Sequence, residues 1–246
     1  MNREEWLRVL HGVSPGLDKK GTVEQSDHYA FDGDHVATFN EELACRAPLS
    51  LGGISCAVKA DPLLRLLEKM TEAEVDVSVA DGKMQIKGKG RRAGVSMEEE
   101  IKLPTDMVAP AGDWTELPED FTDACSVTAS VTSKNTSAFA LCCVHVSATC
   151  LEASDDLQII RYPIDLSDWL GDDDLLIRGS TLAALTGTDV TEASVVDGWA
   201  HFRNPSGLVI TCRSWMEDYP PIDEAVDVDL EGEKITLPGG LAEAVA

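Results

Sequence analysis

Two Asp-Gly pairs lie 116 positions apart in the chain, at 81–82 and 197–198, and each opens a pair of strand-like runs. A short apolar run with helical spacing precedes each pair, at 61–70 and 180–186. Because a helical run, a turn and a hairpin return in the same order, the sequence predicts tandem copies of one structural unit. Such a repeat constrains the architecture more than any single element does.

The segment after the first hairpin is echoed at the end of the chain. Leu117, Pro118, Phe121 and Ala124 match Leu237, Pro238, Leu241 and Ala244, each 120 positions later. We therefore predict a first domain over residues 1–113, a second over 114–231 and the truncated start of a third over 232–246.

Each copy reads as a helix, three or four strands, a second helix and three strands. In the first copy, helices are expected at 3–13 and 61–70, the latter with Leu63, Leu66, Leu67 and Met70 buried, and strands at 23–31, 35–40, 43–49, 54–58, 75–79, 83–89 and 93–97. In the second copy, helices are expected at 118–130, with Pro118 in the first turn, and at 180–186. Strands are expected there at 138–146, 149–153, 157–163 and 175–178, followed by a hairpin around the Asn204–Gly207 turn. This order predicts an α+β fold of tandem domains, each with two helices packed on antiparallel sheets.

The net charge of −24 is concentrated in the second half of the chain. Residues 1–113 carry 14 Lys and Arg against 20 Asp and Glu, whereas residues 114–246 carry 6 against 24. Such a surface repels nucleic acid over most of its area, so any DNA contact requires a local basic patch.

Composition also indicates the compartment. No apolar run approaches the ~18 residues of a membrane span, and the acidic N-terminal helix differs from a signal peptide. The seven cysteines lie mostly in apolar, strand-like runs, which is typical of buried thiols rather than of a disulfide framework. We expect a cytoplasmic protein without a membrane partner.

Four stretches carry a family resemblance: EQSDHYAFDGDHVATFNEELACRAPLSL (24–51), CLEASDDLQIIRYPI (150–164), HFRNPSGLVITCRSWMEDYPPID (201–223) and ITLPGGLAEAVA (235–246). With them the chain resembles the bacterial β sliding clamp, the processivity ring of the replicative DNA polymerase, and most closely the clamp-like proteins of phage genomes. The resemblance implies the DNA-clamp fold. Family members have three such domains per subunit and close into a dimeric ring of six domains.

The resemblance further implies that the helices face a central channel and contact the DNA backbone without reading its sequence. The implied DNA-binding residues are Arg8, Lys19, Lys20, Lys59, Arg65, Lys69, Lys134 and Arg178. A solvated helix face explains any one of them as well, and Glu119, Asp120 and Asp123 place acid on the second domain's first helix. The densest basic cluster, Lys83, Lys87, Lys89, Arg91 and Arg92, lies on a hairpin, where we interpret it as an ordinary exposed strand pair.

Residues 153–159, ASDDLQI, occupy the place of a family Ala-Thr-Asp-Gly-His-Arg-Leu motif. That motif lines a hydrophobic pocket for short partner peptides, including those of the replicative polymerase and the clamp loader. The implied pocket residues are Leu151, Ser154, Asp155, Leu157, Gln158, Ile159 and Pro238. Asp156, Leu157 and Gln158 depart from the motif, so the partners can differ from those of the family.

The function expected from these features is a non-enzymatic DNA sliding clamp that forms a homo-oligomeric ring and uses no cofactor. The alternative is an acidic, clamp-like decoy that captures the clamp loader or replication proteins without encircling DNA. A metallo-enzyme using Cys142, His145 and Cys150 is less favoured, because their spacing matches no compact zinc motif and strand alternation would place Cys142 and His145 on opposite faces. We therefore expect no metal site.

Overall fold

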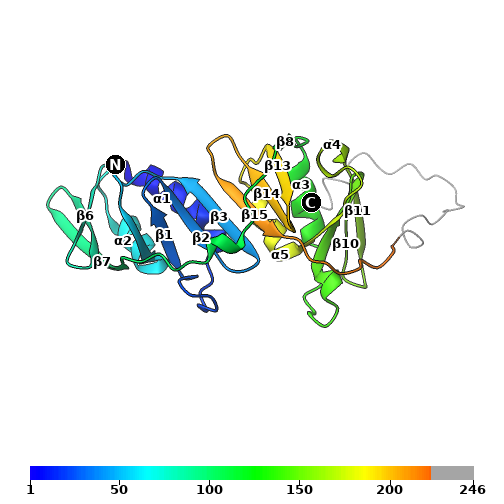
Figure 1. The fold of residues 1–246 in the computed structure, drawn as a ribbon, viewed down its shortest axis with the longest axis horizontal. Helices are drawn as coiled ribbons and strands as arrows, with labels where there is room; N and C mark the ends of the chain where they lie inside the picture. The colour runs from blue at the N-terminus through cyan, green and yellow to red at the C-terminus, as the bar shows by residue number, and fades with distance from the viewer. Residues whose placement is uncertain (223–246) are drawn as a thin grey trace, which may run out of the picture.

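The structure is a computed structural model that describes residues 1–222 (Figure 1). The elements of the first half are α1 (Arg3–Val13), η1 (Ser14–Gly16), β1 (His28–Asp32), β2 (His35–Phe39), β3 (Leu43–Pro48), β4 (Ser55–Lys59), α2 (Ala60–Lys69), β5 (Asp76–Ala80), β6 (Lys83–Gly88), β7 (Arg91–Glu98) and η2 (Thr105–Met107). Those of the second half are β8 (Thr115–Glu116), α3 (Phe121–Ala129), η3 (Phe139–Cys142), β9 (Cys143–Val146), β10 (Cys150–Ser154), β11 (Ile159–Pro163), α4 (Ser167–Leu170), β12 (Leu175–Arg178), α5 (Gly179–Leu182), η4 (Ala183–Leu185), β13 (Glu192–Val196), β14 (Trp199–Arg203) and β15 (Val209–Arg213). Within the described part of the chain, no helix has the length and apolar character needed to cross a membrane.

One antiparallel sheet of eleven strands runs through both halves, in the order β5-β6-β7-β4-β1-β2-β3-β15-β14-β13-β8. The halves meet where β3 pairs with β15, with Arg46 opposite Val209 and Leu43 opposite Cys212. A second sheet, in the order β11-β10-β9-β12, belongs to the second half alone. In Figure 1 the two halves lie side by side along the long axis, with β3 and β15 adjacent at the centre.

The helices and the linker between the two halves (residues 99–114) cover opposite faces of the large sheet. Trp6, Leu10 and Val13 of α1 are fully buried against the strands, and the Tyr29 hydroxyl donates to the Leu10 carbonyl at 3.1 Å. On the other face, Leu103 of the linker packs with Phe39 and Trp199. This arrangement of helices over antiparallel sheets confirms the predicted α+β fold.

The two halves repeat backbone conformations as well as sequence. Asp81 and Gly82 have φ of 54° and 67°, and Asp197 and Gly198 have 49° and 79°. Positive φ at both central residues is the mark of the type I′ turn favoured in two-residue hairpins. Glu41, before β3, and Asp156, before β11, share a φ of 73°. Thus β1–β7 correspond, in order, to β9–β15.

Three predicted elements begin three or more residues from their expected starts. The strand predicted at 23–31 begins only at His28, because Gln25 has a φ of 61° that no strand accommodates. The strand predicted at 138–146 is the 3₁₀ helix η3 up to Cys142 and a strand only from Cys143. Helix 118–130 begins at Phe121, whose N–H donates to the Pro118 carbonyl, so Pro118 lies in the turn before the helix.

Candidate nucleic-acid and partner interface

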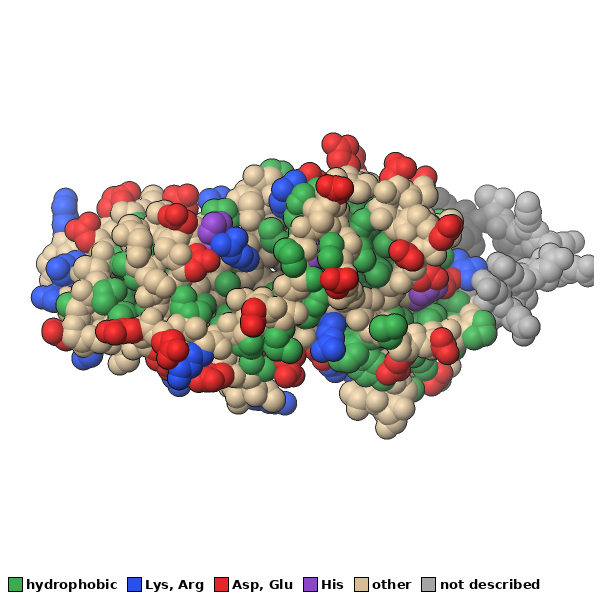
Figure 2. Space-filling view, viewed as in Figure 1, with side chains coloured by type: hydrophobic (Ala, Val, Ile, Leu, Met, Phe, Trp, Pro, Cys, Tyr) green, Lys and Arg blue, Asp and Glu red, His purple; other side chains and the backbone are tan. Residues whose placement is uncertain are grey.

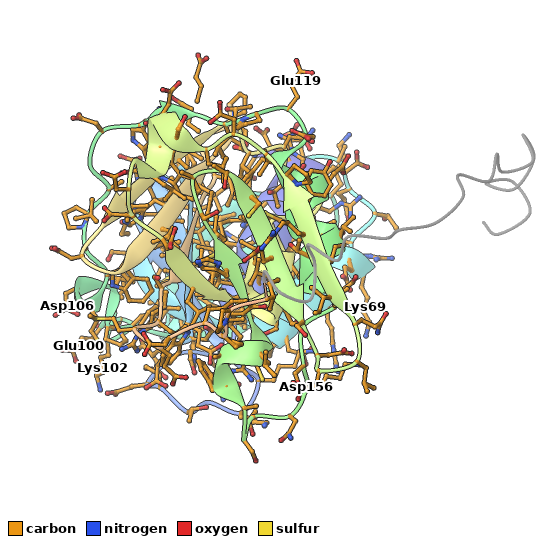
Figure 3. All side chains as sticks on the ribbon, turned by 90° about the vertical axis from the view of Figure 1, so that its right-hand side faces the viewer. Lys69, Glu100, Lys102, Asp106, Glu119 and Asp156 are labelled. Carbon is orange, nitrogen blue, oxygen red and sulfur yellow. The ribbon has the colours of Figure 1, made fainter. Side chains whose placement is uncertain are left out.

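Three of the predicted DNA-binding residues lie on α2 or directly before it. Lys59 ends β4, and its Nζ is 3.4 Å from Asp27 Oδ2; Arg65 Nη2 is 3.1 Å from Asp61 Oδ2 one helical turn earlier. Lys69 is the last residue of α2, and its side chain is exposed. Figure 3 shows Lys69 on the side of the molecule opposite the linker residues Glu100, Lys102 and Asp106. The α2 cations therefore share the helix side and not the linker side.

Arg8, Lys19 and Lys20 are also exposed, in separate places. Arg8 lies on α1, at the rim of a groove between the two halves. Lys19 and Lys20 occupy the turn after η1, which is fixed by Asp18: its carboxylate accepts from the N–H of Lys20 at 2.8 Å and from that of Thr22 at 3.1 Å. Hydrogen bonds from Thr22 and Lys20 lower the pKa of Asp18. The acid that holds the turn thus stays ionised beside two lysines.

The second half contributes Lys134 and Arg178, in a different setting. Lys134 is exposed in the loop after α3, and Arg178 ends β12 directly before α5, as Lys59 ends β4 directly before α2. Arg178 Nη1 is 2.6 Å from Glu42 Oε1, and its guanidinium lies 5.9 Å from the Phe139 ring centroid. Arg178 therefore holds the two halves together, which reduces its availability to phosphate.

The helix side of the second half also carries acid. Glu119, Asp120 and Asp123 precede or open α3, and Asp120 Oδ2 accepts from the Tyr162 hydroxyl at 3.1 Å. Figure 2 views the opposite, linker side, where acidic side chains also lie over much of this half and Lys and Arg lie at the tip formed by β6 and β7. On the helix side, the acids of α3 thus contrast with Arg65 and Lys69 of α2 in the first half.

A groove of roughly 810 Å³ separates α1 from the second half. Its walls are α1, around Arg8 and His11, and two segments of the second half, 184–189 and 204–208. Pro48 also lines the groove, and Gly207, with a φ of +85°, lies so near it that a Cβ on Gly207 would come 2.8 Å from Pro48 Cγ. The groove is a surface of the junction, formed by both repeats.

The predicted partner-pocket residues are divided between core and surface. Leu151 and Ser154 of β10 are buried, so they support the site rather than contact a ligand. Asp155 Oδ1 accepts from the N–H groups of Leu157 and Gln158 at 3.0 and 2.8 Å and shapes the turn. That turn presents Leu157, 89% exposed, and Ile159, 41% exposed. Pro238 lies outside the described residues.

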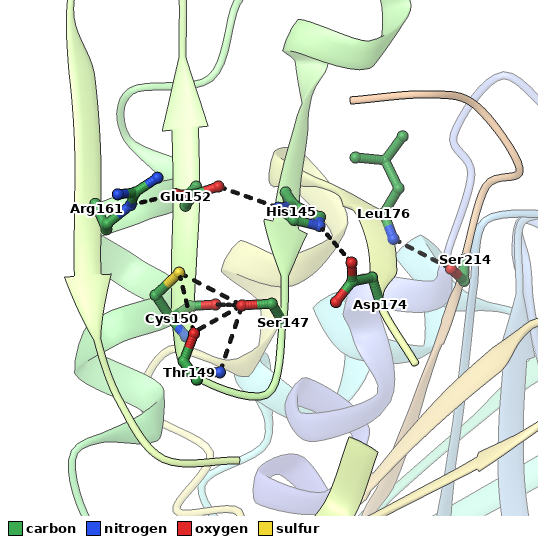
Figure 4. Close-up of polar contacts among 9 residues, drawn as sticks. All are labelled: His145, Ser147, Thr149, Cys150, Glu152, Arg161, Asp174, Leu176 and Ser214. Carbon is green, nitrogen blue, oxygen red and sulfur yellow. Dashed lines mark hydrogen bonds and ion pairs between the residues drawn. The ribbon is translucent and has the colours of Figure 1, made fainter. Parts of the chain in front are cut away.

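A cluster that the sequence did not reveal lies in the same sheet as this turn, on β9, β10 and β11 and at the residue before β12 (Figure 4). His145 Nδ1 is 3.1 Å from Glu152 Oε2, its Nε2 is 3.2 Å from Asp174 Oδ2, and Arg161 forms an ion pair with Glu152. The Tyr219 ring stacks on His145 with centroids 5.2 Å apart, and burial raises the pKa of Tyr219 to about 12. The cluster fastens the exit segment 215–222 across the sheet. The only sequence signal for this cluster is the alternation of side-chain direction along β9 and β10, which gives no information on the pairing of His145 with Glu152.

The metal-ligand hypothesis finds no support in the geometry. Cys142 lies in η3, where its thiol faces the carbonyls of Asn135 and Ala138, so the orientation expected from strand alternation was wrong. Both ring nitrogens of His145 face carboxylates, and the Cys150 thiol lies 3.4 Å from Ser147 Oγ. Over residues 1–222, no group of three or more His, Cys, Asp or Glu side chains could hold a metal ion.

Comparison with known proteins gave matches to structures alone. No protein-family profile and no curated protein sequence matched the chain. The DNA polymerase III beta chain of Streptococcus pneumoniae superposes with a TM-score of 0.80 at 15% identity, over 93% of this chain and 67% of that one. The Pseudomonas aeruginosa beta subunit gives 0.77 at 13% identity (94% and 68%), and the Bacillus subtilis sliding clamp 0.75 at 12% (93% and 67%).

This chain has the sliding-clamp fold. It spans about two thirds of the length of those clamps, and the match confirms the fold that the family resemblance implies. In this fold, Arg8 of α1 and Arg65 and Lys69 of α2 lie on the helix side of the first half. The β10–β11 turn belongs to the second half, where β11 is the edge strand of the smaller sheet.

Proposed function

We propose that the chain is a non-enzymatic sliding clamp that encircles duplex DNA without sequence preference and tethers the replicative polymerase. The clamp fold, matched along 93% of the chain, carries this proposal. The exposed cations of the helix side support it, since Lys and Arg side chains that contact DNA phosphates bind through charge and not through base sequence.

The DNA contacts proposed are those of Arg8, Lys19, Lys20, Lys59, Arg65, Lys69 and Lys134, with Arg178 in a secondary role. Lys69 is the strongest candidate because it is exposed and no ion pair is formed with it in the described part of the chain. Lys59 and Arg65 would exchange their Asp27 and Asp61 partners for phosphate, which reduces their net contribution.

The partners proposed are the polymerase and the clamp loader, through short hydrophobic peptides. Support comes from Leu157 and Ile159, apolar side chains held in solvent by the turn that Asp155 shapes. An exposed apolar pair of this kind favours a partner with its own apolar anchors. We place the activity in the cytoplasm of a bacterial or phage-infected cell, without a cofactor.

The assembly proposed is a closed homo-oligomeric ring. The family resemblance implies a ring of six clamp units, and the structure describes two of these units in one chain. The domain boundaries proposed, 1–113 and 114–231, place the β3–β15 pairing at the contact between successive units.

The acidic decoy remains a second candidate because of one observation: Glu119, Asp120 and Asp123 lie where the second half would face DNA. A decoy would bind clamp-loader peptides and show no salt-dependent affinity for DNA.

The salt dependence of duplex binding tests the proposal. We expect Arg65→Ala/Lys69→Ala to reduce the slope of log K against log salt by about 0.9 for each phosphate that no longer meets a cation. Lys102→Ala is the matched control, since Lys102 lies on the linker side and is paired with Glu24 at 3.2 Å. Equal slopes for the wild type and the double variant would remove α2 from the DNA interface, and no measurable DNA binding would favour the decoy.

A further inference from the structure

A strongly basic hairpin lies at the outer end of the first half. Five of the chain's 20 Lys and Arg residues lie between positions 83 and 92, and no Asp or Glu lies between Gly82 and Met97. The five are Lys83 and Lys87 of β6, Lys89 of the turn, and Arg91 and Arg92 of β7, and all are exposed. In a chain with a net charge of −24, this hairpin is a local surface of the opposite sign.

Strand alternation places three of these cations on one face of the sheet. Met84 and Ile86 are fully buried in the core that α2 covers. Lys83 and Lys87 alternate with them along β6 and therefore point to the opposite face. The register pairs Lys87 with Arg92, which lies on that face too. This face belongs to the linker side, where Figure 2 shows Lys and Arg at the tip formed by β6 and β7.

Acidic side chains do not neutralise this face. Among the described residues, none of the five cations forms an ion pair with an acid. Two acids share the face of β5, β6 and β7 in the described structure: Asp76, the cross-strand neighbour of Lys87, and Glu98 at the end of β7. Glu98 is already bound, since its Oε2 accepts from Gln25 Nε2 at 2.7 Å. The cations therefore exceed the acids that can pair with them.

The two strands also bring like charges together. Lys87 and Arg92 lie directly opposite one another across the β6–β7 ladder. Like charges at directly opposite positions destabilise a sheet. Gly90 permits the arrangement, because its φ of +81° lets β6 turn directly into β7. An anion bound between the two side chains would remove the repulsion, so the pair favours an anionic ligand.

The positions around the cations are small or polar. In the register, Ser78, Gly94 and Ser96 flank them on the same face. Arg92 donates to the Gln85 side chain, which holds its guanidinium against the sheet. Hydroxyl, amide and guanidinium groups are typical partners of phosphate oxygens, and small side chains let a ligand approach closely.

This face lacks the anchors that a protein partner would use. On the outward positions of β5, β6 and β7 there is no large apolar side chain. Protein interfaces depend on buried apolar and aromatic anchors, whereas nucleic-acid interfaces are polar and positively charged. Residues 82–98 also include no aromatic residue on which a base could stack. The ligand that fits is the phosphate backbone of a nucleic acid, bound without regard to sequence.

We propose that Lys83, Lys87 and Arg92 form a second nucleic-acid site, the outer site, on the side of the molecule opposite the helix side. Lys83 and Lys87 are four residues apart, about 13 Å along the strand, so they reach different phosphate groups. Lys89 and Arg91 extend the contact around the turn. The outer site goes beyond the proposed clamp function, because it holds DNA outside the surface that the helix side offers to the duplex.

The salt dependence of oligonucleotide binding tests the outer site. The full chain is titrated with a fluorescently labelled single strand and with a duplex of the same sequence, and binding is followed by anisotropy. Lys83→Gln/Lys87→Gln should reduce the slope of log K against log salt by about 0.7 for each lost phosphate contact on the single strand and by about 0.9 on the duplex. A reduction with one probe alone identifies that form of nucleic acid as the ligand.

Arg46→Gln/Lys102→Gln is the matched control. It removes two positive charges from the same side of the sheet, but Arg46 is paired with Asp32 at 3.0 Å and Lys102 with Glu24 at 3.2 Å. This variant should keep the wild-type slope. Lys83→Arg/Lys87→Arg, which retains both charges, should keep it as well.

Three results would overturn the proposal. The first is a wild type that binds neither probe at low salt. The second is a slope that Lys83→Gln/Lys87→Gln changes no more than the control does, with both probes. The third is binding of poly-glutamate that depends on Lys83 and Lys87 while oligonucleotide binding does not, because the hairpin would then be a site for an acidic protein.

Combination with Arg65→Ala/Lys69→Ala separates the outer site from the proposed helix-side interface. If both surfaces bind nucleic acid, the reductions in slope from the two pairs of substitutions should add. A reduction from the α2 pair alone would overturn the outer site and leave the clamp interface standing. A reduction from Lys83→Gln/Lys87→Gln alone would do the reverse.

Discussion

Arg178 Nη1 lies 2.6 Å from Glu42 Oε1, although the two residues are 136 positions apart and belong to different halves of the chain. Thr181 Oγ1 lies 3.5 Å from the other oxygen of the same carboxylate. Glu42 also accepts from the backbone of Arg213, so one residue joins the end of β12, the start of α5 and the end of β15. The junction is therefore fixed by charge as well as by the strand ladder.

A double-mutant cycle on this pair should show coupling. Arg178→Met and Glu42→Gln should each lower the free energy of unfolding, with a coupling of about 1–2 kcal/mol for a half-buried, charge-assisted hydrogen bond. Urea titration of the wild type, both single variants and the double variant gives this quantity. Strictly additive effects would show that the ladder alone holds the halves together.

Gly207→Ala should destabilise the junction more than Gly187→Ala. Both glycines have positive φ, at +85° and +75°, so alanine costs about 1 kcal/mol of backbone strain at either site. Only at Gly207 would the new methyl group meet Pro48, and we expect a total loss of at least about 2 kcal/mol there. Similar losses at both sites, measured by urea unfolding, would mean that Pro48 simply moves aside.

Leu67 and Leu66 should respond differently to truncation. Leu67 is fully buried in the core, so Leu67→Ala should cost about 2–5 kcal/mol. Leu66 is half-buried at the groove beside β7, so the sequence prediction that both leucines are buried holds only for Leu67. Leu66→Ala should cost less than about 2 kcal/mol, because less of its side chain is removed from water. A larger loss for Leu66 than for Leu67 would contradict this orientation of α2.

His201 should make stability fall in mild acid. Burial lowers the pKa of His201 from 6.5 to about 4, and its Nδ1 lies 2.9 Å from Thr211 Oγ1. Because the unfolded chain takes up a proton below pH 6.5 and the folded chain resists it, this contribution is complete above pH 6.5 and is lost as pH falls toward 4. The loss should reach about 3 kcal/mol.

The control for this prediction is His201→Gln, which is neutral at every pH. The difference in unfolding free energy between the wild type and the variant should shrink steadily from pH 7 to pH 4. A constant difference would show that His201 titrates normally in the fold.

Local chemistry explains what the sequence could predict. The two Asp-Gly turns were predictable because few residue pairs accept positive φ at both positions of a type I′ turn. Helix α2 was predictable from its apolar spacing. The start of β1 was not, because Gln25 adopts a left-handed conformation that its residue type does not signal.

Long-range pairing explains what the sequence could not predict. The β3–β15 ladder joins residues more than 160 positions apart, and the His145–Glu152–Asp174 cluster exists only because β9, β10 and β12 are neighbours. Among the proposed site residues, the exposure of Lys69 followed from the apolar spacing of its helix, whereas that of Leu157 was not predicted. The burial of Leu151 and the pairing of Arg178 with Glu42 required the tertiary structure.

Encirclement of DNA can be measured by cross-linking the protein while it is on DNA. The chain is treated with a lysine-reactive cross-linker in the presence of circular plasmid and then washed in high salt, which removes electrostatic binding. We predict that the cross-linked protein stays on the circular plasmid and is released when the plasmid is linearised. Release of cross-linked protein by salt alone, equally from circular and linear DNA, would contradict a clamp that encircles its DNA.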